Sequence, residues 1–575
     1  MSDGDPLPVD LPGGHSPYPT ERVNVDVLIV GTGPIGCTFA RKLVAAGRSV
    51  HMVDAGAKLS DRPGAHLKNA FLYQRDLDPF ASVIRGHLHL LSVAPDYSSA
   101  LRLDPAAYQV DRRKYGSFVQ NNANPKQDPV FNLPAAAATY AVGGMATHWT
   151  CACPRFHPSE RTQLLSDAEW SRLYDEAEAL LEVRPRRSVS SHPFEESMRH
   201  AVVLEALQRE YRELKPPWAP RNLPLACSRR QDNNEFVTWS GADTVLGPLA
   251  DLPGHSAKFT LKEQHRCKRL VVHKGGRIDY AVVENLLEWR TLHVKANAYV
   301  LAAGAVLTPQ LLYNSRIRPR ALGLHLTEQP MAFCQVVLKR SIVEGIAKDP
   351  RFARRVRAFR RKFPYDPVPI PSNEPEPQVM IPVSGTRPWH CQIHRDAFQY
   401  GDIAPNVDDR VVVDLRWFGI VRQRRENKVT FSDTYHDTFG MPQPTFHWLL
   451  DDEDRERQHA MMVDMLRAAS CLGGFLPGSE PQFMDPGLTL HIHGTIRMGS
   501  DDRTSVTDPF CRVWRFDNLY LGGNGLLSEG SASNPTLTSV ALAIRAAEDL
   551  VRGDRPVVRP RRRPRAGAAA AGSSG

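Results

Sequence analysis

The sequence lacks several features that would place it in common classes of protein. None of its apolar runs approaches the ~18 uncharged residues that suggest a membrane-spanning helix, so we expect no membrane association. Residues 1–11 lack the basic and apolar regions of a signal peptide, which predicts a cytoplasmic location. The nine cysteines include no paired C-x₂-C unit, so we expect no metal site and free thiols in a reducing compartment.

Net positive charge is small outside the C-terminus, although the net charge of the chain is +9. Residues 552–565 contain seven Arg and one Asp, which leaves only +3 for the rest of the protein. We expect a disordered basic tail over residues 553–575 and a flexible N-terminal arm over residues 1–21, because neither composition can form a core. The charge therefore does not by itself predict a specific nucleic-acid partner.

A glycine-rich turn near the N-terminus predicts a dinucleotide site. The apolar run Val25–Val30 has the character of a buried parallel strand and leads into a G-x-G-x-x-G motif, after which residues 37–43 have a helical pattern. In this context Gly31 permits the tight turn, Gly33 lets a pyrophosphate approach the backbone, and Gly36 lets helix and strand pack closely. The N-terminus of the helix supplies N–H groups for the phosphates.

An acidic residue supports this interpretation. Asp54 follows the second expected strand, residues 49–53, at the position where a carboxylate accepts hydrogen bonds from ribose hydroxyls. The sequence thus predicts a Rossmann-like dinucleotide-binding unit, although this motif alone does not separate NAD from FAD.

Two later segments resemble the glucose-methanol-choline (GMC) flavoenzymes. Residues 303–312 (AGAVLTPQLL) resemble the second signature of that superfamily, and residues 519–525 with 534–538 resemble its closing flavin-binding element. The resemblance implies FAD as the cofactor. The cofactor-binding positions that it adds are Gly304, Gly523, Asn524 and Thr536.

Within that superfamily the chain resembles the pyranose 2-oxidase family over most of residues 25–550. Residues 143–152 (GGMATHWTCA) are similar to the motif in which that family bonds a histidine to the 8α carbon of FAD. The resemblance implies a covalent bond to His148, a threonine at the reaction face of the flavin at Thr150, and cofactor contacts at Gly143 and Gly144.

The segment His491–Gly499 resembles the catalytic loop of that family. Oxidation of an alcohol needs a base for the hydroxyl proton, and a histidine suits this task. The resemblance places the base at His491 and its amide partner at Asn534. Fungal members commonly have glycine at the position of His493, and we expect only one of the two histidines to reach the flavin.

Sugar recognition is expected along one short segment and one further strand. Alternating residues between positions 392 and 400 would share a face in a strand and combine polar groups with aromatic rings. The resemblance places the substrate-recognition loop here, and we expect Arg416 to face the same cavity. The expected substrate-binding residues are Gln392, His394, Asp396, Phe398, Tyr400 and Arg416.

The expected fold class is α/β (α+β), with two domains. A discontinuous Rossmann-like FAD-binding domain is expected over residues 22–165, 225–330 and 485–552. A substrate-binding domain, built on an antiparallel sheet with helices, is expected over residues 166–224 and 331–484. Helices are expected at 167–183, 453–471 and 536–552, and a proline-rich loop at 363–378.

The resemblance implies an oxidase that converts the C2 hydroxyl of an aldopyranose such as D-glucose to a ketone. FAD would take the hydride, and O₂ would be reduced to H₂O₂, or a quinone would take its place. Two alternatives stay open: oxidation at C3 of glycosides or C-glycosides, and a flavin-bearing redox sensor whose basic tail binds nucleic acid. We also expect a homo-oligomer, a tetramer or a dimer.

Overall fold

The computed structural model describes residues 20–70, 126–128, 130–183, 197–230, 236–251, 257–273, 275–288, 290–395, 403–404, 406–437 and 439–553. The N-terminal arm and the basic tail predicted above lie almost wholly outside these ranges. Within them, no helix has the length and apolar character needed to cross a membrane.

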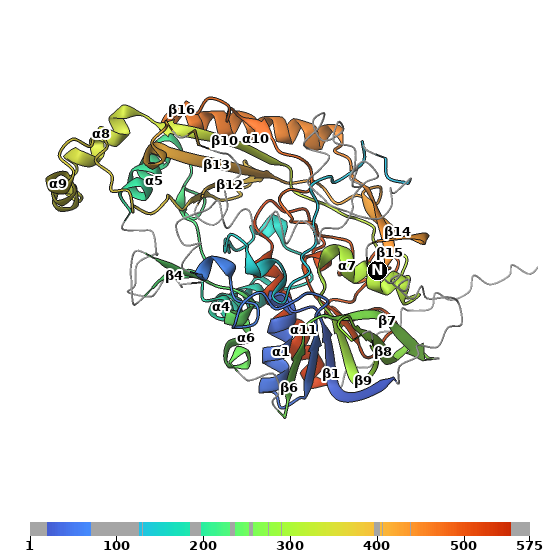
Figure 1. The fold of residues 1–575 in the computed structure, drawn as a ribbon. Coiled ribbons are helices and arrows are strands. Elements are labelled where there is room, and N and C mark those ends of the chain that lie inside the picture. The colour runs from blue at the N-terminus through green and yellow to red at the C-terminus, as the bar shows by residue number, and fades with distance from the viewer. Residues whose placement is uncertain are drawn as a thin grey trace, which may run out of the picture.

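One half of the molecule is built on a mixed sheet of seven strands (Figure 1). Along it lie β6 (Phe259–Lys262), β2 (Val50–Val53), β1 (Glu21–Val30), β9 (Arg290–Leu301), β8 (Arg277–Asn285) and β7 (His265–His273), while β18 (Leu519–Leu521) also pairs with β9. Strands β6, β2, β1, β9 and β18 run parallel, whereas β8 and β7 add an antiparallel extension. This is the Rossmann-like unit that the glycine motif predicts.

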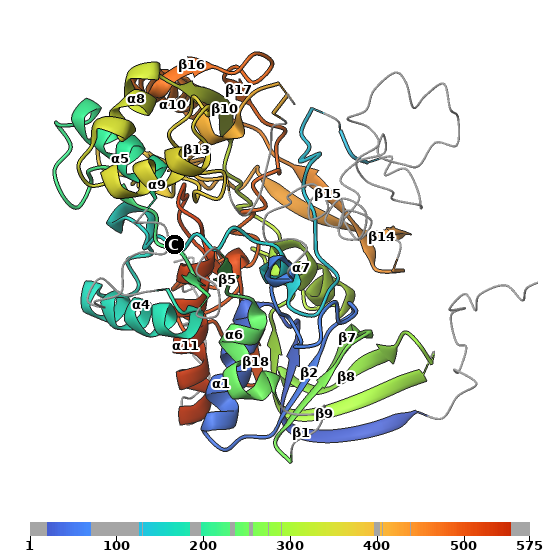
Figure 2. The same ribbon diagram turned by 60° about the vertical axis from the view of Figure 1, so that its left-hand side comes forward.

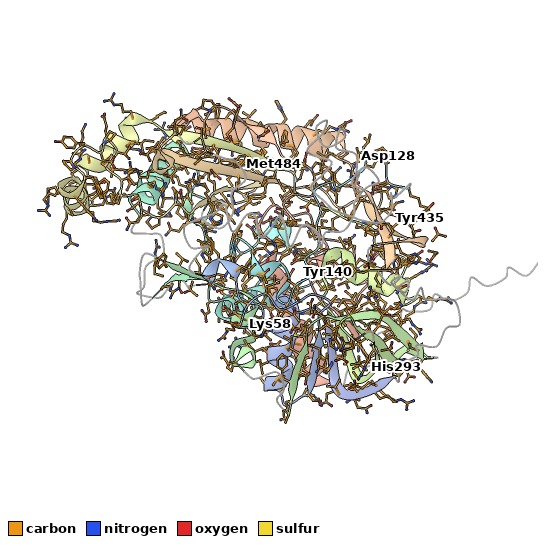
Figure 3. The ribbon with its side chains drawn as sticks, in the orientation of Figure 1. Lys58, Asp128, Tyr140, His293, Tyr435 and Met484 are labelled. Carbon is orange, nitrogen blue, oxygen red and sulfur yellow. The ribbon has the colours of Figure 1, made fainter. Side chains whose placement is uncertain are left out.

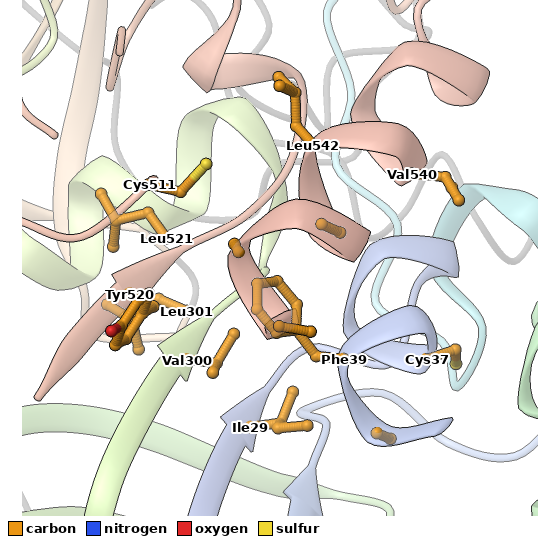
Figure 4. Packing of buried hydrophobic residues seen from close by; sticks show 14 of the residues in the cluster. Ile29, Cys37, Phe39, Val300, Leu301, Cys511, Tyr520, Leu521, Val540 and Leu542 are labelled. Atoms are coloured by element: carbon orange, nitrogen blue, oxygen red, sulfur yellow. The ribbon is translucent and has the colours of Figure 1, made fainter. Parts of the chain in front are cut away.

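Helices cover one side of the parallel strands. Figure 2 shows α1 (Pro34–Ala45), α6 (Ala242–Leu246) and α11 (Thr536–Arg552) together beside the sheet. Buried side chains fill the layer between them, among them Ile29 and Val300 from the strands and Phe39 from α1 (Figure 4). Helix α1 begins with proline at its first position, where the missing N–H costs no hydrogen bond.

The other half is built on a second sheet of seven strands, all of whose pairings are antiparallel. In order they are β16 (Gly473–Phe475), β10 (Met331–Leu338), β13 (Val412–Gly419), β12 (Trp389–Ile393), β11 (Val379–Ile381) and β3 (Arg221–Asn222), with β17 (Gln482–Phe483) also on β10. Helices α10 (Asp452–Leu472) and α5 (Met198–Glu210) share a hydrophobic core with this sheet. Asp451 caps α10 by accepting a hydrogen bond from the backbone of Asp454.

Smaller elements connect and flank the two halves. Helix α7 (Gly304–Asn314) follows β9, and the hairpin of β14 (Lys428–His436) and β15 (Pro442–His447) packs near it. A two-stranded sheet joins β4 (Cys227–Arg229) to β5 (Val237–Trp239). Helices α8 (Arg340–Lys348) and α9 (Ala353–Lys362) project from one end of the molecule in Figure 1, and residues 363–378 after them form the predicted loop.

One domain boundary differs from the expectation. Helix α4 (Asp167–Leu181) was expected in the substrate-binding domain, but it packs with the dinucleotide-binding half through Trp170 and its neighbours. Arg545 of α11 donates to Glu169 at 2.7 Å, and Arg172 pairs with Glu548 at 2.9 Å. The apolar face of α4 indicates only that it is buried, and it does not indicate which sheet the helix covers.

All nine cysteines are free thiols, and eight of them are buried. The ninth, Cys471, is half-buried near the end of α10. This agrees with the absence of paired cysteine motifs in the sequence.

Candidate functional site

A cavity of about 360 Å³ lies between the two sheets. Tyr140 lines this cavity. In Figure 3 it lies between His293, which is on a strand of the first sheet, and Met484, which lies beside the second sheet. The sequence-predicted residues that line the cavity are Gly31, Gly33, Asp54, Gly144, His148, Thr150, Gly304, Gln392, Arg416, His491, Gly523, Asn524, Asn534 and Thr536. Gly36, Gly143 and His394 do not line it, and Asp396, Phe398 and Tyr400 lie outside the described residues.

The glycine loop begins where β1 ends. Gly31 has a φ of +99°, and a Cβ there would lie 2.5 Å from the carbonyl oxygen of Ala302, so only glycine fits. Gly36 does not line the cavity. It packs against the backbone of the glycine loop, where a Cβ would lie 2.0 Å from the oxygen of Gly31. The two glycines therefore shape the loop, while Gly33 faces the open space.

Thr32, between two of the glycines, ties three segments together. Its backbone N–H and its hydroxyl both donate to Asp54 Oδ2, at 2.9 and 2.6 Å. The same hydroxyl accepts a hydrogen bond from the backbone of Gly143 at 2.8 Å. Burial raises the pKa of Asp54, and these hydrogen bonds oppose that shift. Residues 32, 54 and 143 are far apart in the sequence, and the dinucleotide motif leaves the residue after its first glycine unspecified.

Three parallel strands end at the same edge of the first sheet, and a glycine follows each of them. Gly33 follows β1, Gly304 follows β9 and Gly523 follows β18. A Cβ on Gly304 would have no atom within 4 Å, and those on Gly33 and Gly523 would be 4.0 and 3.9 Å from the nearest one. Bare backbone therefore faces the cavity at three places, beside the N-termini of α1 and α7. This arrangement fits the phosphates and flavin of a dinucleotide.

His148 stands at the end of a short helical turn and has a defined tautomer. The hydroxyl of Thr147 donates to the carbonyl of Gly144 at 2.9 Å and lies 3.0 Å from Nδ1 of His148. Because a hydroxyl has one proton to donate, it accepts from Nδ1–H, and Nε2 keeps its lone pair. A neutral ring nitrogen with a lone pair is the nucleophile that covalent attachment of a flavin needs.

His491 and Asn534 meet at the cavity wall, with Asn534 Nδ2 lying 3.4 Å from His491 Nε2. His491 Nδ1 lies 2.7 Å from Oε1 of Gln329, an oxygen that can only accept, so Nδ1 carries the proton. Burial lowers the pKa of His491 to about 3, with a smaller contribution from His493. The ring is therefore neutral, with the lone pair of Nε2 available at the cavity.

His493 does not reach the cavity. Its ring is fully buried, and its two nitrogens lie 2.8 and 3.1 Å from the backbone oxygens of His491 and Glu529. Of the two histidines, His491 lines the cavity and His493 does not.

The substrate side of the cavity is formed by two neighbouring strands. Gln392 on β12 is the register partner of Arg416 on β13, and both line the cavity. Gln392 Nε2 donates to Asn534 Oδ1 at 2.5 Å, which turns the NH₂ group of Asn534 toward His491. Arg416 is 1% exposed and lies 3.6 Å from Asp414, so it is a buried cation with a carboxylate beside it.

The strand that carries Gln392 ends before His394. Strand β12 ends at Ile393, and His394 turns away to hydrogen-bond with Gln378. His394 is consequently not a lining residue, because alternation along a strand holds only while the strand continues.

Several lining residues escaped the sequence analysis. Phe418, two residues after Arg416 on β13, places its ring centroid 5.9 Å from that of His491. Alternation along β13 could have identified it. Tyr140 and Phe439 stack at 4.3 Å and line the cavity as well, but they are about 300 residues apart and no local pattern connects them.

Comparisons with known proteins identify relatives of the chain. Residues 423–543 match the sequence model of the GMC oxidoreductase family. The chain is 46% identical to a pyranose 2-oxidase from Tricholoma matsutake, over 92% of this chain and 93% of that protein. It is 33% identical to a C-glycoside 3-oxidase from Microbacterium trichothecenolyticum, over 93% and 97% of the two chains.

The fold is also similar to solved structures of low sequence identity. A formate oxidase from Aspergillus oryzae RIB40 superposes with a TM-score of 0.61 at 14% identity, covering 93% of this chain and 99% of that one. Given the sequence similarity over nearly the whole chain and this shared architecture, the protein belongs to the pyranose 2-oxidase family of GMC oxidoreductases.

Proposed function

We propose that the protein oxidises the C2 hydroxyl of an aldopyranose such as D-glucose to a ketone, with FAD as the hydride acceptor. The observation that carries this proposal is the pair of His491 Nε2 and Asn534 Nδ2 beside a glycine-lined dinucleotide cradle. Pyranose 2-oxidases 40–46% identical to the chain over about 92% of its length support the choice of substrate and position.

When bound, FAD would supply the acceptor for the hydride from carbon and a route for two electrons to O₂, which gives H₂O₂, or to a quinone. Gly33, Gly304 and Gly523 would hold it against the ends of the parallel strands, with Asp54 near the ribose. His148 would hold it covalently through Nε2, and Thr150 would face its reactive side. The remaining steps belong to side chains of the cavity.

His491 takes the hydroxyl proton of the sugar on Nε2, so that the carbon–oxygen bond becomes a carbonyl as the hydride leaves. Asn534 donates through Nδ2 to the same oxygen and orients it, and because an amide carries no charge it does not compete for the proton. Arg416 offers donors to the other hydroxyls and Gln392 offers its amide oxygen as an acceptor, while Phe418 gives the apolar face of the ring a surface. Because burial lowers the pKa of His491, its imidazole is unprotonated at ordinary pH and Nε2 has a lone pair for the proton.

The test is the rate of flavin reduction by D-glucose, measured anaerobically by stopped flow, together with H₂O₂ formed in air. The proposal requires sugar-dependent bleaching of the flavin absorbance, and peroxide or a reduced quinone on reoxidation. A preparation that holds FAD but is not reduced by any aldopyranose would overturn it. That result would leave the redox-sensor alternative, in which deletion of residues 553–575 should abolish binding to DNA.

Oxidation at C3 is the second candidate, because C-glycoside 3-oxidases are 32–33% identical to the chain over almost its whole length. NMR of the product from D-glucose separates the two candidates, since the ketone carbon is C2 in one case and C3 in the other. The same samples, analysed by light scattering, would test the predicted homo-oligomer.

A further inference from the structure

The two residues of the proposed catalytic pair stand on irregular segments that have no helix or strand to hold them. His491 follows Leu490, which has a φ of +57°, a left-handed conformation that is rare for leucine. Asn534 lies in the loop before α11. Strain of this kind persists only where the surrounding structure over-determines it.

We propose that three buried side chains are positioning residues that keep His491 and Asn534 in place relative to each other. They are Gln329, Glu328 and Glu160. This inference rests on the proposed function, because it concerns how the same pair is kept ready for proton transfer. None of the three lines the cavity, so each acts through the pair and not on the substrate.

Gln329 spans the two loops. Its Nε2 donates to the carbonyl oxygen of Ser533 at 3.0 Å and to the hydroxyl of Ser531 at 3.3 Å. Its Oε1 is consequently turned toward His491 Nδ1, at 2.7 Å. The loop that carries Asn534 thereby fixes the orientation of the amide, and the amide fixes which nitrogen of His491 carries the proton.

Glu328 holds the loop that carries His491. Its carboxylate accepts from the backbone N–H of His491 at 3.1 and 3.2 Å, from that of Gln329 at 2.7 Å, and from the hydroxyl of Thr489. The side chain is 1% exposed. Next to it, Thr327 and His493 exchange two backbone hydrogen bonds of 2.9 Å, which fixes the far end of the same loop.

Glu160 holds the loop that carries Asn534 in the same way. Its carboxylate accepts from the backbone of Ala532 at 2.8 Å, and from both the backbone and the hydroxyl of Ser533 at 2.9 Å. It is 2% exposed. Each loop therefore has its own buried carboxylate, and Gln329 joins the two loops.

The first experiment changes the partner of His491. Gln329→Glu replaces an amide oxygen by a charged acceptor at Nδ1, which stabilises the protonated imidazole. The acid limb of the pH profile of flavin reduction should then move to higher pH. Gln329→Leu removes the acceptor, and the rate of reduction should fall on the order of 10- to 100-fold at every pH, with a smaller change in KM. Gln458→Leu, a buried glutamine on α10, is the matched control and should retain the wild-type profile.

The second experiment asks whether the carboxylates act through the pair. Glu328→Gln places an N–H₂ group among backbone donors and should slow flavin reduction, and Glu160→Gln should do the same. In a His491→Ala background, Glu328→Gln should cause little further loss, and Glu160→Gln should cause little further loss in Asn534→Ala. Glu374→Gln, a buried glutamate that contacts neither loop, is the control.

The outcomes separate this inference from the proposed function. Wild-type enzyme that no sugar reduces overturns the proposed function. Wild-type reduction that is unchanged in Gln329→Leu and in both glutamate variants overturns the inference alone. A further result to consider is that the glutamate variants slow flavin reduction by the same factor in the His491→Ala and Asn534→Ala backgrounds as in the wild type. That result would assign the three residues a general structural role, and it also overturns the inference. If Gln329→Leu does not retain FAD, the pH profile of Gln329→Glu decides.

Discussion

Nδ2 of Asn534 lies 3.4 Å from Nε2 of His491, although 43 residues separate them in the chain. A substrate hydroxyl at hydrogen-bond distance from both atoms would donate its proton to His491 and accept a hydrogen bond from Asn534. The pair can therefore bind and deprotonate the same oxygen without a charged group, and the following predictions test parts of this arrangement.

Removal of the base should slow the chemical step much more than binding. In His491→Ala the hydroxyl proton has no acceptor at the cavity wall, and we expect flavin reduction to slow on the order of 10²- to 10⁴-fold. Anaerobic stopped-flow traces against D-glucose measure this rate. The control His273→Ala, at the exposed end of β7, should behave as wild type. Near-normal reduction in His491→Ala would remove this residue from the mechanism.

The pH at which flavin reduction begins to fall on the acid side should be far below the ordinary pKa of histidine. A base works when it is neutral, and burial lowers the pKa of His491 to about 3, so protonation should not limit flavin reduction above about pH 5. The profile should be recorded in Glu328→Gln as well, so that ionisation of Glu328 is not mistaken for that of His491. A limb centred near pH 6.5 that persists in both proteins would contradict this prediction.

Covalent attachment of FAD should depend on the hydroxyl of Thr147. Thr147→Val keeps the shape of the side chain but removes the acceptor for His148 Nδ1–H. The proton is then no longer held on Nδ1 and can occupy Nε2, where it removes the lone pair. We expect less flavin to stay with the protein after acid precipitation, whereas Thr147→Ser should retain it. His148→Ala should release all of it. Equal retention in Thr147→Val and wild type would refute the role of the hydroxyl.

Glu328 should make the stability of the fold depend on pH. Burial raises the pKa of its carboxyl from 4.5 to about 7, so between these values the folded protein binds a proton that the unfolded chain releases. Its contribution is complete below pH 4.5 and is lost as the pH rises to 7, a change of about 3 kcal/mol. The free energy of unfolding of the wild type should consequently fall more than that of Glu328→Gln from pH 5 to pH 8. Parallel curves for the two proteins would contradict this expectation.

The parts of the site with a local signature were predictable from the sequence. The glycine loop after β1, Asp54 after β2 and the helix that begins at Thr536 each follow from spacing within a few residues. His491, Asn534 and His148 were found because their segments resemble known motifs. The structure adds their distances and tautomers.

The supporting residues could not be predicted in this way. Glu160 contacts Ser533 across 373 positions and Glu328 contacts His491 across 163, and a single carboxylate in a sequence gives no sign of such a partner. The end of β12 before His394 was not predictable for another reason, because a strand ends where its pairing ends, and pairing depends on the neighbouring strand. Packing in the tertiary structure also decided the place of α4.

The burial of the cysteines bears on how long an enzyme that makes H₂O₂ can work. Peroxide oxidises thiolates, and burial raises the pKa of thiols such as Cys267, Cys334 and Cys511 to about 12, so these remain protonated. The half-buried thiol of Cys471 is raised only to about 11 and is the most accessible of the nine. Oxidation of cysteine by the enzyme's own peroxide during prolonged turnover should therefore begin at Cys471, which lies near the end of α10 and does not line the cavity where the chemistry takes place.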